Sequence, residues 1–200
     1  MAGVDEAGRG SLFGPVVAAA VVLHPEDRIR GLNDSKLLDT PTRERLDREI
    51  RARALAWAVA AEDAAAIDAV NILQASRRAM LAAVIALARR PDCLLVDAVA
   101  LDWPGEQRAL IHGDARSISI AAASILAKVH RDALMRAWDP VFPAYRLAGN
   151  KGYSSPEHLA ALRRHGPSPL HRRSYAPVAA AAPGAACQLA FDQLPGGTAK

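Results

Sequence analysis

The sequence is poor in the residues that crosslink small folds or line carbohydrate sites. It has 2 cysteines, and aromatic residues make up 4% of the chain. Cys93 lies in an apolar run and Cys187 in a segment rich in proline, alanine and glycine, with no metal-type spacing between them. We therefore expect two free thiols, with neither a disulfide framework nor a cysteine-bound metal.

Long apolar runs are also missing. The longest candidate, residues 14–23, is about half of the roughly 20 residues that span a bilayer, which is typical of a buried strand. Near its start the chain carries Asp5 and Glu6, where a secretory signal has lysines ahead of an apolar core. We expect a cytoplasmic protein with no membrane partner.

Charge of one sign is not in large excess. The net charge of +4 and the pI of about 9.4 permit a polyanionic partner without requiring one. Between residues 43 and 53 arginines alternate with acids, which predicts a solvated helix surface that includes Arg43. The length of 200 residues, 51% of them hydrophobic, fits one packed domain.

The hydrophobic pattern predicts a mixed sheet covered by helices. Gly3–Val4 and residues 16–23 form an antiparallel hairpin, residues 54–61 a third strand, and two short apolar runs near residues 93–97 and 108–114 each end in aspartate. Helices are expected from a Thr40 N-cap, from residue 71 to about 90, over residues 117–138 and from about residue 155. Residues 1–175 form the predicted domain, and residues 176–200 a flexible tail.

Four acids stand out by position in or at the ends of predicted strands: Asp5, Glu6, Asp97 and Asp114. Each alone is also compatible with a turn or a helix cap. As a set, they would converge at one edge of the sheet, where a carboxylate cluster cannot stay ionised without a cation. We place Asp5 at the centre and Glu6 at the rim, because successive strand side chains face opposite ways.

The expected cation is Mg²⁺ or Mn²⁺, because no histidine or cysteine is placed to help the carboxylates. Two such ions roughly 3.5–4 Å apart would activate a water and stabilise the leaving oxygen of a phosphodiester. Along the helix after Asp114, one face carries Ser117, Ser124, Lys128 and Arg131, which suits contacts with a phosphate backbone. An exposed polar stripe remains an equally good interpretation of that face.

Together these segments resemble the type 2 ribonucleases H, and among them the bacterial ribonuclease HII family. The resemblance rests on "GVDEAGRG", "LNDSKLL", "VDA", "GDARSISIAAASILAKVHRD", "NKGYSSPEH" and "HGPSPLHRRSY", in the family's order from Gly3 to Tyr175. It implies an α/β ribonuclease H-like fold, a mixed five-stranded sheet flanked by helices with a small helical C-terminal extension. It also implies a metal-dependent endoribonuclease that hydrolyses the RNA strand of RNA/DNA hybrids and nicks DNA duplexes 5′ to embedded ribonucleotides, leaving 3′-hydroxyl and 5′-phosphate ends.

Carried over residue by residue, the resemblance assigns the metal ligands and the substrate contacts. The acidic metal site falls on Asp5, Glu6, Asp97 and Asp114. Gly8, Arg9 and Gly10 correspond to the ribose sensor, whose glycines let the backbone approach a 2′-hydroxyl. Tyr153 corresponds to the tyrosine that packs on the following deoxyribose, although a core tyrosine is the other interpretation. Lys36, Ser124 and Lys128 would contact phosphates.

Three other functions fit the sequence less well. A dinucleotide-binding turn fails because Phe13 stands where the last glycine of G-x-G-x-x-G belongs. A glycosidase also uses paired carboxylates, but aromatic residues that face sugars are scarce. A noncatalytic nucleic-acid binder would not need all four acids. We expect a monomer, and residues 188–191, "QLAF", weakly resemble a sliding-clamp-binding peptide.

Overall fold

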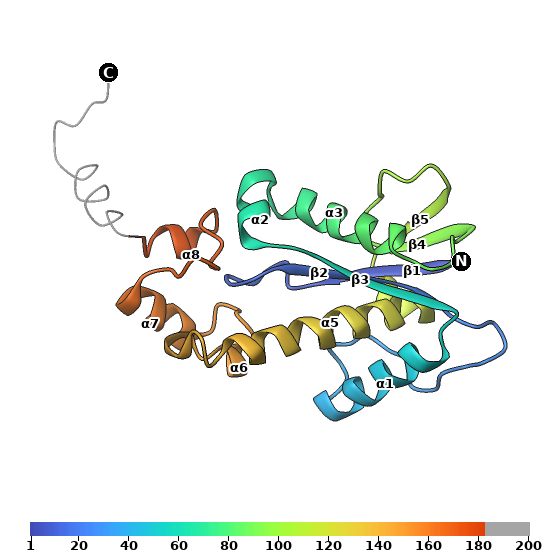
Figure 1. Cartoon of the computed structure of the whole chain (residues 1–200), viewed down its shortest axis with the longest axis horizontal. Helices are drawn as coiled ribbons and strands as arrows, with labels where there is room; N and C mark the ends of the chain where they lie inside the picture. Colours follow the sequence, from blue (N-terminus) through green and yellow to red (C-terminus); the bar gives the residue numbers. More distant parts are fainter. Residues whose placement is uncertain (183–200) are drawn as a thin grey trace, which may run out of the picture.

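The computed structural model describes residues 1–182, which form a mixed five-stranded sheet between two layers of helices (Figure 1). The sheet has the order β3-β2-β1-β4-β5. Its strands are β1 (Ala2–Ala7), β2 (Val16–Val22), β3 (Ala56–Glu62), β4 (Cys93–Asp97) and β5 (Glu106–Leu110). This architecture confirms the predicted fold class.

Helices of two groups cover opposite faces of the sheet (Figure 1). One face carries α2 (Ala64–Val70) and α3 (Ile72–Ile85), and the other carries α1 (Thr40–Arg53) and the long α5 (Ile118–Trp138). The one-turn helix α4 (Gly113–Arg116) precedes α5. Both faces of the sheet are therefore sealed from water, which is why the central strands are almost entirely apolar.

Strand β1 lies at the centre and is paired on both sides. It runs antiparallel to β2, with Asp5 opposite Ala19, which confirms the predicted hairpin. On its other side it runs parallel to β4, and the last pair of that ladder is Val4 with Val96. The third predicted strand is confirmed as β3, which pairs antiparallel with β2.

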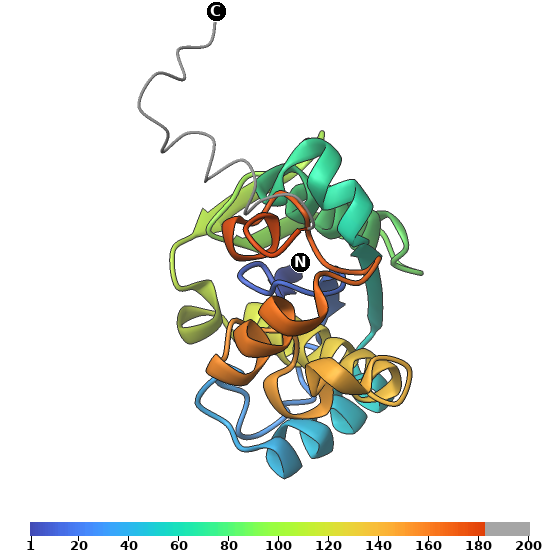
Figure 2. The ribbon, with the colours of Figure 1, turned by 90° about the vertical axis from the view of Figure 1, so that its left-hand side faces the viewer.

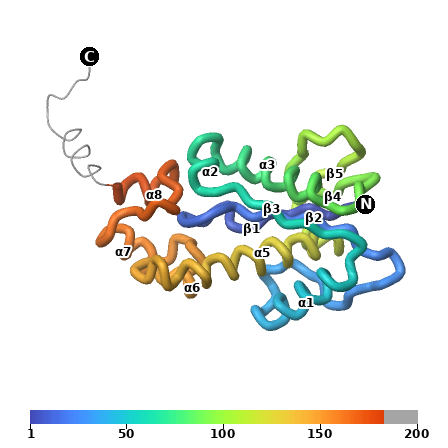
Figure 3. Tube along the Cα trace, viewed as in Figure 1, coloured from blue at the N-terminus to red at the C-terminus, as the bar shows by residue number. Residues whose placement is uncertain are grey.

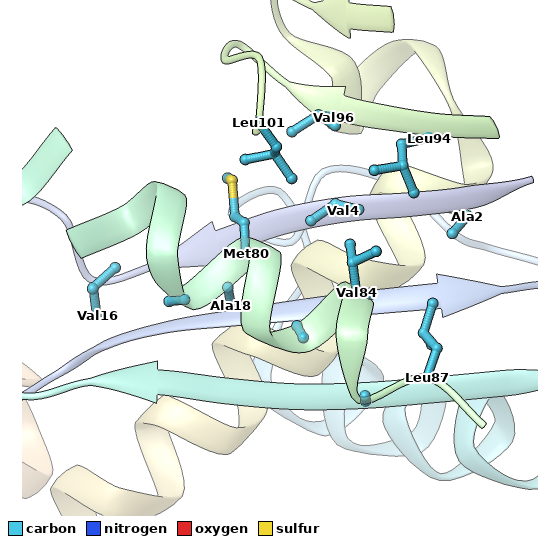
Figure 4. Packing of buried hydrophobic residues seen from close by; sticks show 14 of the residues in the cluster. Ala2, Val4, Val16, Ala18, Met80, Val84, Leu87, Leu94, Val96 and Leu101 are labelled. Carbon is cyan, nitrogen blue, oxygen red and sulfur yellow. The ribbon is translucent and has the colours of Figure 1, made fainter. Parts of the chain in front are cut away.

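Side-chain alternation in β2 divides the interior into two cores. Val16, Ala18 and Val22 face α3, within the cluster of Figure 4, whereas Val17 and Val21 face α1 and α5. All seven residues of β2 are buried. Their small size allows the helices to approach the sheet closely, so the helical layers are held by direct packing.

A third group of helices closes one end of the sheet (Figure 2). It consists of η1 (Pro143–Tyr145), α6 (Leu147–Asn150), α7 (Pro156–His165) and α8 (Ala176–Ala179). Phe13 from the β1–β2 connection is fully buried in its core, together with Leu162 and Val178. This C-terminal layer therefore packs on the loop that follows the first strand (Figure 3).

A chain of buried polar groups runs through the C-terminal layer. His171 Nδ1 accepts from the Ser168 amide at 3.0 Å, so the neutral ring carries its proton on Nε2. That proton is donated to His158 Nε2 at 3.0 Å, and His158 Nδ1 donates in turn to the Tyr153 carbonyl at 2.8 Å. Burial lowers the pKa of His158, and it lowers the pKa of His171 to about 3.

Several element boundaries differ from the sequence prediction. Helix α1 is capped by Asp39, whose side chain accepts from the Thr42 amide, and not by Thr40. Helix α3 ends at Ile85 and not near residue 90, since the Leu87 amide turns to the Val84 carbonyl three residues back and the α-helical pattern stops there. The predicted helix at residue 155 is confirmed as α7, with Ser155 as its N-cap.

The packed chain continues past the predicted boundary at residue 175, because α8 follows and its Val178 is fully buried. The rest of the predicted tail, including Cys187 and residues 188–191, lies outside the described residues. Cys93 is a free thiol, as expected. Within the described part of the chain, no helix combines the length and the apolar character that a bilayer crossing requires.

Candidate active site

The site opens where the two central parallel strands part. The ladder between β1 and β4 ends at Val4 and Val96, and the next residue on each strand is an aspartate, Asp5 and Asp97. Helix α5 passes directly behind this point, because Gly3 has no side chain: a Cβ there would lie 2.1 Å from the Ser119 carbonyl carbon. This close approach sets the acids of the strands against the first half of α5.

Asp5 is the most deeply buried acid of the group, with 4% of its surface exposed. Its Oδ1 accepts from the Glu6 amide at 2.6 Å, and the Ser124 hydroxyl of α5 hydrogen-bonds to its side chain. Desolvation raises the pKa of Asp5 well above its usual value, and the charges of Glu6 and Asp97 raise it further. Burial and the neighbouring negative charges therefore both disfavour the ionised form of this carboxyl group.

Glu6 also turns into the site, although strand alternation predicted a place at the rim. Its Oε1 accepts from Arg9 Nη1 at 3.3 Å, whereas its Oε2 is buried and has no hydrogen-bond partner among the described residues. Burial raises the pKa of Glu6, and the nearby charge of Arg9 only partly offsets that effect. An unpartnered buried carboxylate oxygen is costly, and a ligand that binds it removes the cost.

Asp97 and Asp114 are brought together by the turn after β5. Asp97 Oδ1 accepts from the Gly113 amide at 2.7 Å, and Asp114 follows in α4 with 7% of its surface exposed. The prediction that Asp114 ends a strand was wrong, because β5 stops at Leu110 and a one-turn helix carries the acid. It does not cap α5 either, since Ser117 does so.

These four acids fit a hard divalent cation by chemistry. Every donor is a carboxylate oxygen, which Mg²⁺ and Mn²⁺ prefer, and both Asp5 and Glu6 have pKa values raised by burial and by neighbouring negative charge. Across residues 1–182, no three His, Cys, Asp or Glu side chains stand close enough to hold an ion as they are now oriented. Backbone amides occupy Asp97 Oδ1 and Asp114 Oδ1, so the acids are turned apart.

Lys36 supplies positive charge beside the acids. Its Nζ lies 3.6 Å from Asp114 Oδ2. Partial desolvation acts to lower the pKa of Lys36, but the charges of Asp34, Asp114 and Asp5 outweigh it and raise the pKa. The ammonium group therefore remains charged and exposed at the entrance of the site, where an anionic substrate would meet it.

A groove of about 640 Å³ joins the acids to the predicted substrate contacts. All of the predicted site residues except Asp114 line it: Asp5, Glu6, Gly8, Arg9, Gly10, Lys36, Asp97, Ser124, Lys128 and Tyr153. Segments from β1, the loop after β2, β4, α5 and the C-terminal layer thus meet in one place. Asp114 is tied to the groove through Lys36.

Two polar residues of the groove were missed from the sequence. Ser35 lies in the "LNDSKLL" segment, and its hydroxyl pairs with that of Ser124 at 2.9 Å. Arg43 was predicted to lie on a solvated helix face, but it lines the groove and donates to the Ser35 carbonyl at 3.0 Å. The quoted motif already contained Ser35, whereas nothing in the charge alternation of α1 distinguished Arg43 from its neighbours.

Tyr153 lines the groove beside two cations of α5. It is 36% exposed, and its ring lies near two cations: Lys128 Nζ at 5.6 Å from the centroid and the Arg131 guanidinium carbon at 5.4 Å. Lys128 also pairs with Asp132 at 2.8 Å. The two cations therefore hold the ring in place, and the exposed part of the side chain lines the groove.

The polar face of α5 divides into two parts with different surroundings. Ser124 and Lys128 reach the groove, but Ser117 is used as the helix cap. Arg131 was predicted to lie on the phosphate-binding face, and this prediction was wrong, because its side chain is fully buried beneath the C-terminal layer. Helical spacing places residues on one face without showing whether another layer covers part of it.

A mixed sheet whose central β1–β4 pair diverges at a group of acids, with a groove beside them, is the arrangement of a ribonuclease H-like enzyme. Solved structures agree. The ribonuclease H2 from Pyrococcus horikoshii OT3 matches with a TM-score of 0.77 and 26% identity over 90% of this chain and 95% of that one. The RNase HII solved in a complex with PCNA from Archaeoglobus fulgidus matches with a TM-score of 0.73 and 28% identity, over 86% of this chain and 92% of that one.

Sequence comparison narrows this class to one family. The family model of ribonuclease HII matches residues 2–178. The ribonuclease HII of Koribacter versatilis is 62% identical over 89% of this chain and 70% of its own, and that of Solibacter usitatus is 61% identical over 90% and 79%. The chain belongs to the ribonuclease HII family, and it is an endoribonuclease of the type 2 ribonuclease H class.

Proposed function

We propose that this enzyme hydrolyses the RNA strand of RNA/DNA hybrids and nicks duplex DNA on the 5′ side of an embedded ribonucleotide, with Mg²⁺ or Mn²⁺ as cofactor. The products are a 3′-hydroxyl and a 5′-phosphate. The observation that carries the proposal is the set of buried acids beside the groove, with Glu6 Oε2 unpartnered and the pKa of Asp5 raised by burial. Such a cluster is unfavourable alone and suited to divalent cations.

Asp5, Glu6, Asp97 and Asp114 would hold the metal. When bound, the metal supplies Lewis-acid chemistry, which makes water a better nucleophile and neutralises charge on a phosphodiester. Asp5 is the rigid member, because the Glu6 amide and the Ser124 hydroxyl fix its carboxylate. Asp114, on its one-turn helix, would contribute to the metal site the carboxylate that contacts Lys36. Lys36 would bind a substrate phosphate.

The basic residues that line the groove would bind the phosphate backbone. Lys36, Arg43 and Lys128 line it together with Arg9, and the side chains of Lys36 and Arg9 are well exposed. Ser124 supports Asp5 from α5 and would also reach a phosphate. These contacts fix the register of a nucleic acid without reading its sequence.

The Gly8–Gly10 loop and Tyr153 would distinguish RNA from DNA. Gly8 adopts φ +93°, which a residue with a side chain rarely adopts, and a Cβ on Gly10 would meet no atom within 4 Å. The backbone therefore comes to the surface, where it can hydrogen-bond a 2′-hydroxyl. Tyr153, which lines the same groove, would pack on the sugar of the next deoxynucleotide and so read the ribo-to-deoxyribo junction.

The proposal also includes the setting in which the enzyme works. We place it in the cytoplasm as a monomer, with residues 1–175 as the catalytic part and α8 packed on it. The Archaeoglobus fulgidus relative was solved in a complex with PCNA, which supports a contact with a sliding clamp. The tail sequence proposed for that contact, residues 188–191, lies outside the described residues.

The test is cleavage of an end-labelled DNA duplex that carries one ribonucleotide, in Mg²⁺, in Mn²⁺ and in chelator. An all-DNA duplex of the same sequence is the control. We expect one nick, 5′ to the ribonucleotide, that requires the metal and is absent from the control. Equal cutting of the control, or cutting in chelator, would contradict the proposal.

A further inference from the structure

Two arginines beneath the groove are buried without an acidic partner. Arg131 of α5 and Arg172 of the C-terminal layer have 0% of their surface exposed. Throughout residues 1–182, neither forms a salt bridge with an aspartate or glutamate. A buried guanidinium is costly unless its N–H groups are bonded. Arg172 Nη2 has no hydrogen-bond partner among the described residues. Four of the other donors bond backbone carbonyls of the loop that follows β1, which gives this loop a defined support: those of Arg9, Phe13, Gly14 and Pro15.

Arg172 holds the carbonyl groups at both ends of that loop. Its Nε donates to the Gly14 carbonyl at 2.9 Å and its Nη1 to the Arg9 carbonyl at 2.8 Å. The Tyr175 hydroxyl donates to the same Arg9 carbonyl at 2.5 Å. Two donors thus fix that carbonyl, and its orientation is directed inward, away from the groove.

The orientation of the Arg9 carbonyl determines the orientation of the Gly10 amide. A trans peptide is planar, and its C=O and N–H point in opposite directions. With the carbonyl held by Arg172 and Tyr175, the Gly10 N–H points outward to the groove that Gly10 lines. None of the hydrogen bonds within the described part of the chain uses this amide. It is a fixed and unoccupied donor at the surface.

Arg131 connects the same loop to the segment that carries Tyr153. It donates to the Phe13 carbonyl at 3.0 Å and to the Lys151 carbonyl at 2.9 Å, and its guanidinium carbon lies 5.4 Å from the Tyr153 ring centroid. The loop rests directly on it, because a Cβ on Gly8 would lie 2.0 Å from Arg131 Nε. One side chain therefore sets the separation between the loop and Tyr153.

We propose that Arg131 and Arg172 are positioning residues for ribonucleotide recognition. From beneath the groove, Arg172 orients the Gly10 amide outward, where it can bond a 2′-hydroxyl. Arg131 fixes the position of Tyr153 relative to the loop that contains Gly10. This inference rests on the proposed function and deepens it, because it assigns the discrimination between RNA and DNA to side chains that do not touch the substrate. Burial lowers the pKa of Arg131 to about 10, so its guanidinium keeps all of its donors at neutral pH.

The experiment separates recognition of the 2′-hydroxyl from general binding of the duplex. In Mg²⁺ or Mn²⁺, KM and kcat are measured on a DNA duplex with one ribonucleotide. The all-DNA duplex of the same sequence serves as a competitive inhibitor, and its Ki reports binding without the 2′-hydroxyl. The ratio of Ki to KM is the ribonucleotide preference.

The first variant is Arg172→Lys. Lysine keeps the charge but is a point donor, so it cannot bond the Arg9 and Gly14 carbonyls together. We expect KM on the ribonucleotide duplex to rise about tenfold, the size of one lost hydrogen bond, while Ki on all-DNA stays within about twofold. A smaller folded fraction would lower the apparent kcat and leave KM unchanged, so a folding defect gives a different pattern.

A milder variant keeps the test decisive if Arg172→Lys folds poorly. Tyr175→Phe removes only the hydroxyl that bonds the Arg9 carbonyl, and we expect a rise in KM of about threefold, again without a change in Ki. Its matched control is Tyr145→Phe, which removes a hydroxyl from the same core cluster that bonds the Gly166 carbonyl instead. The control should keep the ribonucleotide preference of the wild type.

The outcomes distinguish the positioning role of the two arginines from the proposed function. If the wild type nicks the ribonucleotide duplex but Arg172→Lys and Tyr175→Phe keep its preference, the positioning role is wrong and the proposed function stands. Parallel rises of KM and Ki would also overturn the role, because they show a general loss of binding. If the wild type makes no metal-dependent nick, the proposed function fails and this inference falls with it.

Discussion

Buried polar groups have opposite surroundings at the acidic edge of the sheet and beneath the loop that follows β1. At the edge, Glu6 Oε2 has no partner and negative charges raise the pKa of Asp5. Beneath the loop that follows β1, Arg131 of α5 donates to the Lys151 carbonyl, and His158 and His171 of the C-terminal layer donate to a carbonyl and a ring nitrogen. The difference teaches that one region keeps its polar groups available for a ligand, whereas the other uses them to fix the backbone.

The largest expected effect comes from removing one charge at the edge. Asp5→Asn should lower cleavage of the ribonucleotide duplex by at least about 10³-fold, or about 4 kcal/mol in activation free energy, while hybrid binding is retained. In chelator the variant should be at least as stable as the wild type, because a desolvated charge is lost. Steady-state kinetics, anisotropy binding and urea unfolding measure the three quantities.

A matched control for Asp5→Asn is Asp47→Asn. Asp47 is also buried, but it is bonded to Arg51 Nε at 2.9 Å on α1, away from the acids. This variant should lose stability and keep its activity, the reverse of the pattern at Asp5. Near-normal turnover by Asp5→Asn would remove Asp5 from the metal site.

Addition of the metal should stabilise the protein through the acids at the edge of the sheet. At a Mg²⁺ or Mn²⁺ concentration about 100 times Kd, linkage predicts about 2.7 kcal/mol of added stability, or a rise in Tm of roughly 5–10 °C for a chain of this size. Glu6→Gln and Asp5→Asn should abolish most of the rise. The same increase in Tm for the wild type and both variants would mean that the ions bind elsewhere.

Acid should weaken the C-terminal layer. The pKa of His171 is lowered in the folded state to about 3, from an unfolded value of about 6.5, so the folded state binds this proton less tightly. The corresponding stability is fully present above pH 6.5 and is lost as pH falls from 6.5 toward 3, by about 1.4 kcal/mol per pH unit. Urea unfolding at pH 7, 6 and 5 should show a shallower decline for His171→Gln. Parallel curves for the two proteins would contradict this.

The smallest expected effect is on selectivity. Tyr153→Ala should lower kcat/KM about tenfold on a duplex with a ribo-to-deoxyribo junction and less on a continuous hybrid, because only the junction presents the sugar that the ring packs on. Trp57→Ala is a matched control: both side chains belong to residues that are 36% exposed and lie against a cation, but Trp57 stacks on Arg51 of α1. An equal loss by Tyr153→Ala on every substrate would count against a role in junction reading.

The sequence predicted the sheet and most of the groove because both depend on local pattern and on segments of distinctive composition. Strand β2 could be predicted from its run of Val and Ala, and the acids Asp5 and Asp97 from their place at the ends of apolar runs. The place of Asp114 was missed, since the apolar run before it continues past Leu110 into a turn, where His112 adopts a left-handed φ of 54°. Hydrophobicity does not encode that change of backbone direction.

The local pattern also could not predict which polar side chains of α5 are covered by other parts of the chain. Ser124 and Arg131 lie two turns apart on the same polar face, yet one faces the groove and the other is covered. The covering residues come from the loop that follows β1 and from the segment that contains Lys151 and Tyr153, and contacts over such separations depend on the whole fold. For the same reason Arg43 was interpreted as a surface arginine, although the loop that precedes α1 folds back over its guanidinium.

The bond between Arg172 and the Arg9 carbonyl joins residues separated by 163 positions in the chain. A ribosome that adds 5–20 residues per second needs about 8–30 s to cover that distance. Over the last 58 residues of that distance, from Asp114 to Arg172, the nascent chain contains every acid of the cleavage site but lacks the support of the loop that selects ribonucleotides. Selectivity is therefore the last property that the growing chain acquires, after the potential to cut.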